Sequence, residues 1–151
     1  MNSIITWDES LSTGIAEFDC QLKWIIKYLN SLIKTAGFDQ DSSFMSSLPE
    51  LHQFLMSYSE NEELLMNEIG YPGLESHKHE HRFLLNAFDE IIKRLNSREK
   101  YSNQSAVAFM VDWFTNHICK SDKELAAHLK SIGFTNEQYK YLISCGEEAD
   151  Y

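Results

Sequence analysis

Four long stretches of the sequence repeat apolar residues at steps of three and four, and this period constrains the fold more than any other feature. The first stretch runs from about Ile15 to Ala36, with its apolar residues at Ile15, Phe18, Leu22, Ile25, Leu29 and Leu32. Alternating steps of three and four place such residues along one face of an α-helix, whereas a half-buried strand would alternate at every second residue. The glycine that follows, Gly37, is a typical helix terminator.

The same period recurs in three later stretches. The second stretch carries Phe44, Leu48, Leu51, Leu55, Tyr58, Glu62 and Leu65, the third runs from about Leu74 to Asn96, and the fourth runs from about Gln104 to Lys130. On the fourth we expect Ala106, Met110, Trp113, His117 and Leu125 to be buried. Four helices of similar length joined by short loops predict an all-α, up-down-up-down four-helix bundle.

Two segments lie outside these four helices. Residues 1–14 predict an extended arm that Trp7 pins to the bundle, and the segment that starts at Thr135 predicts a short, capped fifth helix, followed by an acidic, frayed tail from Cys145. We therefore expect a bundle formed by residues 1–130 and a C-terminal extension, residues 131–151, that packs on the bundle or frays from it.

Pro49 interrupts the second stretch and leaves two interpretations open. Residues 47–50 could form a capping box with the proline in the first turn of the helix. Alternatively, the helix could begin near Asp41 and bend at Pro49. Because the apolar stripe runs through both halves, we favour the bent helix.

Charge and cysteine usage narrow the classes of function. The formal net charge of −10 would repel nucleic acid and anionic membrane surfaces, so neither is an expected partner. The three cysteines, Cys20, Cys119 and Cys145, are odd in number and have no paired spacing, which argues against a disulfide framework and against a thiolate zinc site. We expect them to be ordinary small apolar residues. Together with the lack of a signal-peptide pattern or an apolar run of membrane-spanning length, they predict a cytoplasmic protein.

Histidines and acids occupy inward positions of the predicted helices. His117 and Asp122 are five residues apart, which in a regular α-helix turns their side chains about 140° from each other. A packing stripe therefore does not explain both, whereas a shared metal ion does. His77 and His81 are four residues apart on one helical face, a spacing that lets two imidazoles bind one ion.

The expected burial of a carboxylate together with these histidines supports a metal site more strongly than any single histidine does. A buried histidine is often merely hydrogen-bonded, but Glu62 also lies on an inward stripe, and a buried carboxylate is costly unless it is paired or bound to a cation. We therefore predict that His77, His81, His117, Glu62 and Asp122 form a metal site. The three remaining histidines, His52, His79 and His128, are expected at the surface.

The motifs around these residues resemble the hemerythrin-like domains, and within them the bacterial single-domain type. The resemblance rests on Trp7 followed by Thr13-Gly-Ile-Ala-Glu-Phe-Asp19, on Glu62-Glu-Leu-Leu-Met66, on Gly70-Tyr-Pro72, on the HxxxH of His77 and His81, and on Trp113 with the HxxxxD of His117 and Asp122. It covers about residues 5–130. It implies a four-helix bundle around a non-haem di-iron centre, in which five histidines and two bridging carboxylates hold the irons and one iron binds dioxygen reversibly.

The chain departs from the family pattern at two ligand positions. Leu22 stands where the first helix of the family has a histidine, and Tyr58 stands where the second helix has the histidine of HxxxE. Both lost histidines belong to the iron that takes up dioxygen in the family. The retained residues are the family's three terminal histidines of the other iron and its two bridging carboxylates.

Too few donors remain for a second ion, so the sequence predicts one metal ion per chain rather than two. Iron is expected from the resemblance and zinc next, and manganese also suits nitrogen and oxygen donors. Five protein ligands on an ion that accepts six would leave one open position, facing the vacated half-site. Near it, Tyr58 could hydrogen-bond to Glu62, fill the space of the missing iron, or ligate the metal.

Three functions are compatible with such a site. The first is a metal-binding module that binds or senses a small molecule such as O2, NO or peroxide and signals to a protein partner through the C-terminal extension. The second is a mono-iron redox enzyme acting on superoxide or peroxide, which ranks lower because no general base or substrate pocket can be identified. In the third, the bundle is structural, either metal-free or held together by zinc. We favour the binding or sensing function over an enzyme.

Overall fold

The computed structural model describes residues 4–37, 42–97 and 100–147, and these residues form helices and no strands. The order is a short 3-10 turn η1 (Glu9–Leu11), α1 (Ala16–Thr35), α2 (Ser42–Glu68), α3 (Leu74–Asn96), α4 (Asn103–His117), the π-helical turn η2 (Ile118–Asp122), α5 (Lys123–Ser131) and α6 (Asn136–Glu147). None of the described helices is both long and apolar enough to cross a membrane.

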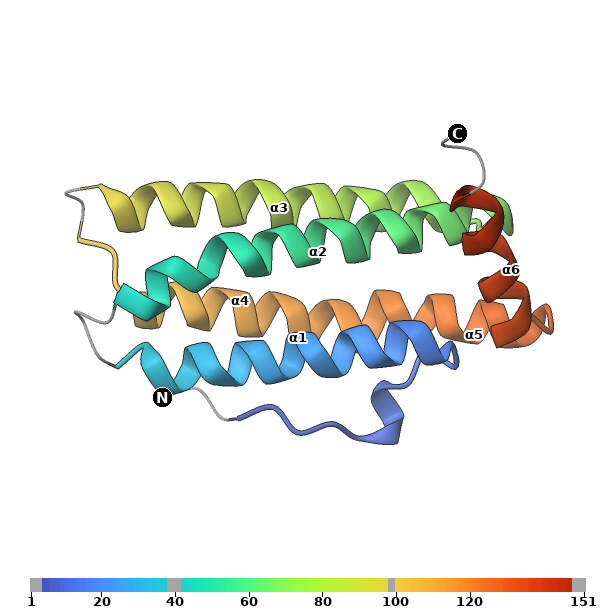
Figure 1. Ribbon diagram of the computed structural model, residues 1–151, viewed down its shortest axis with the longest axis horizontal. Coiled ribbons are helices and arrows are strands. Elements are labelled where there is room, and N and C mark those ends of the chain that lie inside the picture. Colours follow the sequence, from blue (N-terminus) through green and yellow to red (C-terminus); the bar gives the residue numbers. More distant parts are fainter. Residues whose placement is uncertain (1–3, 38–41, 98–99, 148–151) are drawn as a thin grey trace.

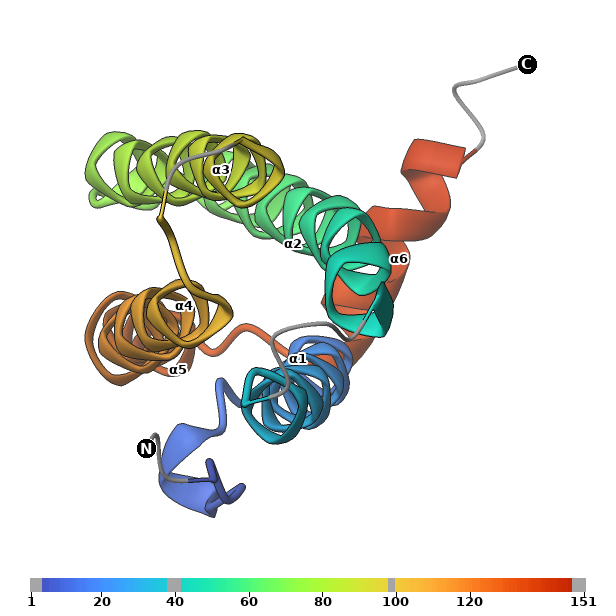
Figure 2. The same ribbon diagram turned by 90° about the vertical axis from the view of Figure 1, so that its left-hand side faces the viewer.

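The predicted four-helix bundle is confirmed. Helices α1, α2, α3 and the α4–α5 pair lie along the long axis of the molecule, and each runs antiparallel to the helix before it in the chain (Figure 1). Viewed along that axis, they occupy the four corners of the bundle, while α6 lies across one end (Figure 2). The core between them contains fully buried side chains from several helices, among them Phe18, Leu22, Phe44, Leu65 and Phe88.

The N-terminal arm is extended and follows the outside of α1, as the sequence predicts (Figure 1). The side chain of Asn30 makes two hydrogen bonds of 2.8 Å to the backbone of Ile5. Its amide nitrogen donates to the carbonyl of Ile5, and its Oδ1 accepts from the N–H of Ile5. Trp7 is half-buried against the core, and the ammonium group of Lys23 lies 4.7 Å from the centroid of its ring. Trp7 therefore contributes both apolar contact and a cation–π interaction to holding the arm.

Helix α2 is continuous through Pro49, so the bent-helix interpretation is correct and a start at Ser47 is wrong. Proline cannot donate the usual backbone hydrogen bond inside a helix, and its ring pushes against the preceding turn. Two side-chain donors lie close to this turn: the Ser47 hydroxyl donates to the carbonyl of Phe44, and the Tyr28 hydroxyl of α1 donates to the carbonyl of Ser47. The first part of α2, in teal, slopes away from α3 (Figure 1).

The fourth helix differs from the single regular helix predicted over residues 104–130. A π-helical turn, η2, separates α4 from α5 between His117 and Lys123. Burial also shifts by one position upstream of it, because Phe114 is buried whereas Trp113, predicted in the core, is only half-buried. Trp113 instead stacks on the ring of His117, four residues later, with 4.5 Å between ring centroids and 17° between ring planes.

The fifth helix is longer than predicted. Thr135 and Gln138 form a capping box, in which the Thr135 hydroxyl accepts from the backbone of Gln138 and the Gln138 side chain accepts from the backbone of Thr135. Helix α6 begins at the next residue, Asn136, and continues to Glu147, so the start of the predicted frayed tail is helical. Residues 148–151 lie outside the described residues.

Asp19 ties the arm to the start of α1. Its carboxylate accepts hydrogen bonds from the Ser12 hydroxyl, the Thr13 backbone and the Thr13 hydroxyl, at 2.5–2.8 Å. Hydrogen bonds to a charged acceptor are stronger than neutral ones. The aspartate therefore fixes the turn through which the chain enters the bundle.

We expect Asp19→Ala to lower the free energy of unfolding by about 2–3 kcal/mol, because several hydrogen bonds to one carboxylate are lost together. For a domain of this size, that corresponds to a fall of roughly 4–12 °C in melting temperature. Thermal unfolding followed by circular dichroism measures it. Glu17→Ala, an exposed acid in the same turn, is the matched control, and equal destabilisation by the two variants would contradict this role.

Candidate metal centre

Three helices and the π-helical turn bring all five predicted ligand residues into one buried cluster. Glu62 comes from α2, His77 and His81 from α3, His117 from the end of α4 and Asp122 from the end of η2. Their exposed fractions range from 0% to 5%. Such burial would be unfavourable for charged groups unless they neutralise one another or bind a cation.

The π-helical turn explains the spacing of His117 and Asp122. Its hydrogen bonds join residues five apart, so it returns the chain to the same side after five residues instead of after three or four. The Nε2 atom of His117 consequently lies 3.0 Å from Oδ1 of Asp122. The sequence indicated that a regular helix would separate these side chains. The π-helical turn is the change in backbone conformation that brings them together.

The facing atoms of the five residues point at one another without forming hydrogen bonds. Nε2 of His77 is 3.3 Å from Oε2 of Glu62 and 3.3 Å from Oδ1 of Asp122, and Nε2 of His81 is 3.1 Å from Oε2 of Glu62. Ligand atoms of Glu62 and the three histidines all lie within 4.8 Å of one another. The three Nε2 atoms, Oε2 of Glu62 and Oδ1 of Asp122 are all buried and have no hydrogen-bond partner among the described residues.

Unsatisfied buried polar atoms are rare in native proteins, and five that converge on one point are what a metal ion would satisfy. Three imidazole nitrogens and two carboxylate oxygens also form a donor set that suits iron, manganese or zinc. The residues present therefore fit a metal ion.

Two further carboxylates, which the sequence analysis missed, contact the outer nitrogens of the histidines. Nδ1 of His117 is 2.6 Å from Oε2 of Glu80, and Nδ1 of His81 is 2.9 Å from Oε1 of Glu63. A carboxylate only accepts hydrogen bonds, so these Nδ1 atoms carry the proton and donate it. When these rings are neutral, as metal binding requires, each Nε2 keeps a lone pair that points at the cluster, the arrangement found around metal-bound histidines.

Glu80 is itself fixed by the π-helical turn. The hydroxyl of Ser121 donates to both of its carboxylate oxygens, at 2.7 and 2.8 Å. Burial raises the pKa of Glu80, but the bonds from Ser121 and His117 outweigh that effect and lower it. The position of Glu80, between the two histidines of HxxxH, was the only sequence signal that could have identified it.

Charge coupling inside the cluster is strong in the metal-free protein. Burial lowers the pKa of His77, but contacts with Asp122 and Glu62 outweigh burial and raise it to about 10. The pKa of His117 is also raised, since its contact with Asp122 overcomes burial. Burial likewise raises the pKa of Asp122, yet the facing His117 and His77 lower it overall. Protons on His77 and His117 thus take the place of a cation.

Of the two positions where the sequence predicts a departure from the family pattern, both are buried and Tyr58 contacts this cluster. The Tyr58 hydroxyl is 3.0 Å from Oε1 of Glu62 and 3.3 Å from Oδ2 of Asp122, and Leu22 is fully buried. Burial and the two carboxylates raise the pKa of Tyr58 well above its usual value, so the phenol stays protonated and donates. Of the three roles open to Tyr58, the structure shows the hydrogen bond to Glu62; ligation stays a hypothesis.

The remaining histidines and cysteines lie away from the cluster. His79 is exposed as predicted, but His52 and His128 are half-buried: Nε2 of His52 is 3.2 Å from Oδ1 of Asp89, and the ring of His128 packs against Tyr71. Cys20 and Cys119 are free and exposed. The side chain of Cys145 lies outside the described residues.

Comparisons with known proteins agree with this geometry. Residues 18–129 match the family model of the hemerythrin HHE cation binding domain. The chain is 30% identical over 122 residues to the bacteriohemerythrin of Methylococcus capsulatus, covering 80% of this chain and 93% of that protein. It is 29% identical over 129 residues to the bacteriohemerythrin of Stenotrophomonas maltophilia, covering 85% and 84%.

Solved structures show the same relationship. A crystal structure of wild-type hemerythrin superposes with a TM-score of 0.76 at 29% identity, covering 83% of this chain and 97% of that one. The matched bundle contains the buried cluster of three histidines and Glu62. The chain therefore belongs to the hemerythrin family, as a cation-binding four-helix bundle with a buried histidine and carboxylate cluster.

Proposed function

We propose that this protein binds a single non-haem iron ion through His77, His81, His117, Glu62 and Asp122, and that it binds or senses a small molecule such as O2, NO or peroxide there. The observation that carries the proposal is the set of five buried, converging atoms without hydrogen-bond partners. The family membership favours iron over zinc or manganese.

The hydrogen bonds of Tyr58 support one ion rather than two. Each of the two carboxylates faces the histidines with one oxygen, namely Oε2 of Glu62 and Oδ1 of Asp122. Their other oxygens, which a bridging carboxylate would offer to a second ion, lie within hydrogen-bond distance of the Tyr58 hydroxyl. The phenol thus occupies the positions through which a second ion would be held, and the hydrocarbon of Leu22 adds no donor.

The chain's own residues define what the site offers a small molecule. When bound, the iron supplies an exchangeable coordination position and redox chemistry. The protein supplies three fixed imidazoles, two carboxylates, and a neutral phenol on the vacated side. That phenol is protonated and donates its single hydroxyl proton to a carboxylate, so it holds the two carboxylates in place next to the proposed ligand position.

We expect His117→Ala to abolish iron binding and to destabilise the protein, because Asp122 and Glu80 would each lose their imidazole partner. Breaking a buried pair in this way costs about 3–5 kcal/mol. Metal content by elemental analysis and melting by calorimetry measure the two effects. His79→Ala, an exposed histidine on α3, is the control. Unchanged metal content in His117→Ala would rule out the proposed ligand set.

Restoring the family's two missing donors tests the stoichiometry. We expect about one iron per wild-type chain and about two in the double variant Leu22→His with Tyr58→His, since imidazoles would replace the hydrocarbon and the phenol. Tyr58→Phe removes only the hydroxyl and should retain one iron. Two irons in the wild-type protein would contradict the single-ion proposal, and no iron after reconstitution would contradict iron binding itself.

The raised histidine pKa values predict a pH dependence. A group whose pKa is raised by folding stabilises the native state below its unfolded pKa and loses that contribution as the pH rises through the folded value. For His77 this window extends from about 6.5 to about 10. The metal-free protein should therefore lose melting temperature across this range, while iron, which binds only neutral imidazole, should bind more tightly as pH rises. Melting and iron titrations at several pH values measure both trends; a pH-independent affinity would contradict proton displacement.

A further inference from the structure

Helix α6 lies outside the matched family region and packs on the vacated side of the centre. The family match ends at residue 129, whereas α6 spans Asn136–Glu147. We propose that α6 is a lid over the vacated half-site and that Tyr139 is the residue through which it controls the entry of small molecules. This inference rests on the proposed function, because it assigns a guarded entrance to the same site.

A chain of ring contacts links α6 to the site. The ring of Tyr139 packs against Phe18 of α1, with 4.9 Å between centroids, and Phe18 meets Tyr58 edge-on, with 5.9 Å between centroids. All three residues are buried, with exposed fractions of 3%, 0% and 4%. Phe18 lies one helical turn before Leu22, on the same face of α1. Tyr139 therefore packs against Phe18, which in turn contacts Tyr58 of the vacated half-site.

Burial and nearby carboxylates affect the phenol of Tyr139. Burial, followed by the charges of Glu17 and Glu62, raises the pKa of Tyr139 to about 12. Its phenol is therefore within electrostatic reach of a carboxylate in the proposed metal site. Among the described residues the phenol has no hydrogen-bond partner, so packing against Phe18 is what holds it.

The start of α6 is anchored to the start of α1. Ile15, the N-cap residue of α1, provides no side-chain cap. Instead, the backbone N–H of Ala16 donates to Oδ1 of Asn136 at 2.8 Å, a hydrogen bond between residues 120 positions apart. Such a bond satisfies one of the free N–H groups at a helix start. Asn136 and Tyr139, one turn apart, thus form two of the contacts that hold α6 in place.

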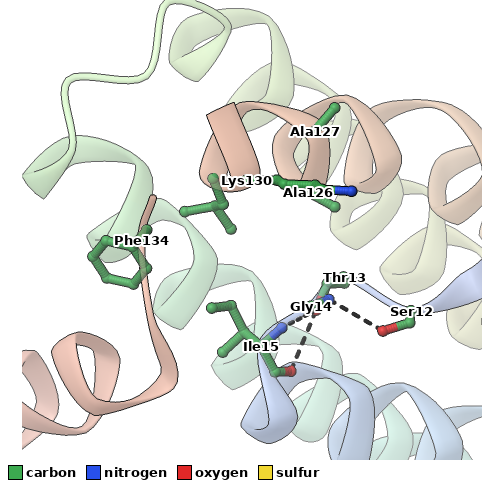
Figure 3. Close-up of a pocket in the computed structure, with 9 residues that line it drawn as sticks. Ser12, Thr13, Gly14, Ile15, Ala126, Ala127, Lys130 and Phe134 are labelled. Carbon is green, nitrogen blue, oxygen red and sulfur yellow. Dashed lines mark hydrogen bonds between the residues drawn. The ribbon is translucent and has the colours of Figure 1, made fainter. Parts of the chain in front are cut away.

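The connection that leads into α6 runs beside a pocket. A pocket of about 370 Å³ lies between the segment that precedes α1, helix α5 and Phe134, and Figure 3 shows Ser12, Gly14, Lys130 and Phe134 around it. Gly133, just before Phe134, has a φ of +68°, which favours glycine and marks a sharp turn. Helix α6 is thus joined to α5 by a glycine turn beside a pocket, and this turn is where we expect the chain to bend when α6 lifts.

Access kinetics test this proposal. In the iron-loaded full-length protein, azide binding is followed by stopped-flow absorbance in the wild type and in Tyr139→Ala. Loss of one aromatic pair and its buried ring should speed association by about two- to tenfold while iron content stays the same. Tyr141→Ala, a 72% exposed tyrosine on the same helix, is the matched control and should bind azide at the wild-type rate.

A second variant keeps the test valid if Tyr139→Ala does not fold. Asn136→Ala removes the anchor to Ala16 and leaves the ring contacts in place, and it should also speed azide binding. Azide association at the wild-type rate in both Tyr139→Ala and Asn136→Ala would contradict the proposal that α6 is a lid. Loss of iron from Tyr139→Ala in place of a faster rate would also overturn it, because Tyr139 would then support the ligand set.

Hydrogen exchange of the metal-free protein separates this proposal from the proposed function. Residues 16–22 should exchange faster in Tyr139→Ala and Asn136→Ala than in Tyr141→Ala, whether or not the protein binds iron. Faster exchange in a protein that takes up no iron would support the proposal that α6 is a lid. It would contradict only the proposal that the site binds iron. Unchanged exchange would contradict the lid, even in a protein that binds iron.

Discussion

The rest of the structure depends on the convergence of buried imidazoles and carboxylates at the centre of the bundle. Three histidines and two acids occupy positions that apolar side chains would otherwise fill, with exposed fractions of 5% or less. Their burial is unfavourable unless each charge finds a partner. The outer carboxylates Glu63 and Glu80, the hydroxyl of Ser121 and the phenol of Tyr58 all serve this requirement by hydrogen-bonding the atoms that do not face the centre. Within the cluster, the polar atoms without a hydrogen-bond partner among the described residues are the five that face one another.

Much of this fold could be predicted from the sequence because periodic apolar residues report directly on helices. The predicted boundaries of the first and third helices agree with α1 and α3 to within one residue, and the continuity of the stripe correctly favoured a helix through Pro49. The π-helical turn could not be predicted. The spacing of His117 and Asp122 showed that a regular helix was incompatible with both facing inward, but spacing does not say how the backbone resolves the conflict.

Residues that hydrogen-bond to the candidate ligands, rather than serving as ligands themselves, could not be predicted from the sequence either. Glu63 and Glu80 carry no periodic signal, since each is a partly exposed acid beside a candidate ligand in the sequence, and such acids are common on helix surfaces. Their role follows only from tertiary geometry, which brings Glu63 of α2 to His81 of α3 and Glu80 of α3 to His117 of α4. Trp113 was assigned to the core for a related reason: a large aromatic at a helical period suggests burial, whereas here its face covers a histidine ring.

The state of the vacated half argues for a rebuilt site rather than a decayed one. Simple loss of two histidines would leave a cavity and two carboxylate oxygens without partners. Instead, Leu22 is fully buried, and the Tyr58 hydroxyl lies within hydrogen-bond distance of both carboxylates. On the other half, each outer carboxylate that orients a histidine is in place. In a decayed site nothing would be expected to replace the lost histidines, whereas here Tyr58 contacts the far oxygens of both carboxylates while their near oxygens face the three histidines. This asymmetry supports the proposal of a centre for one ion.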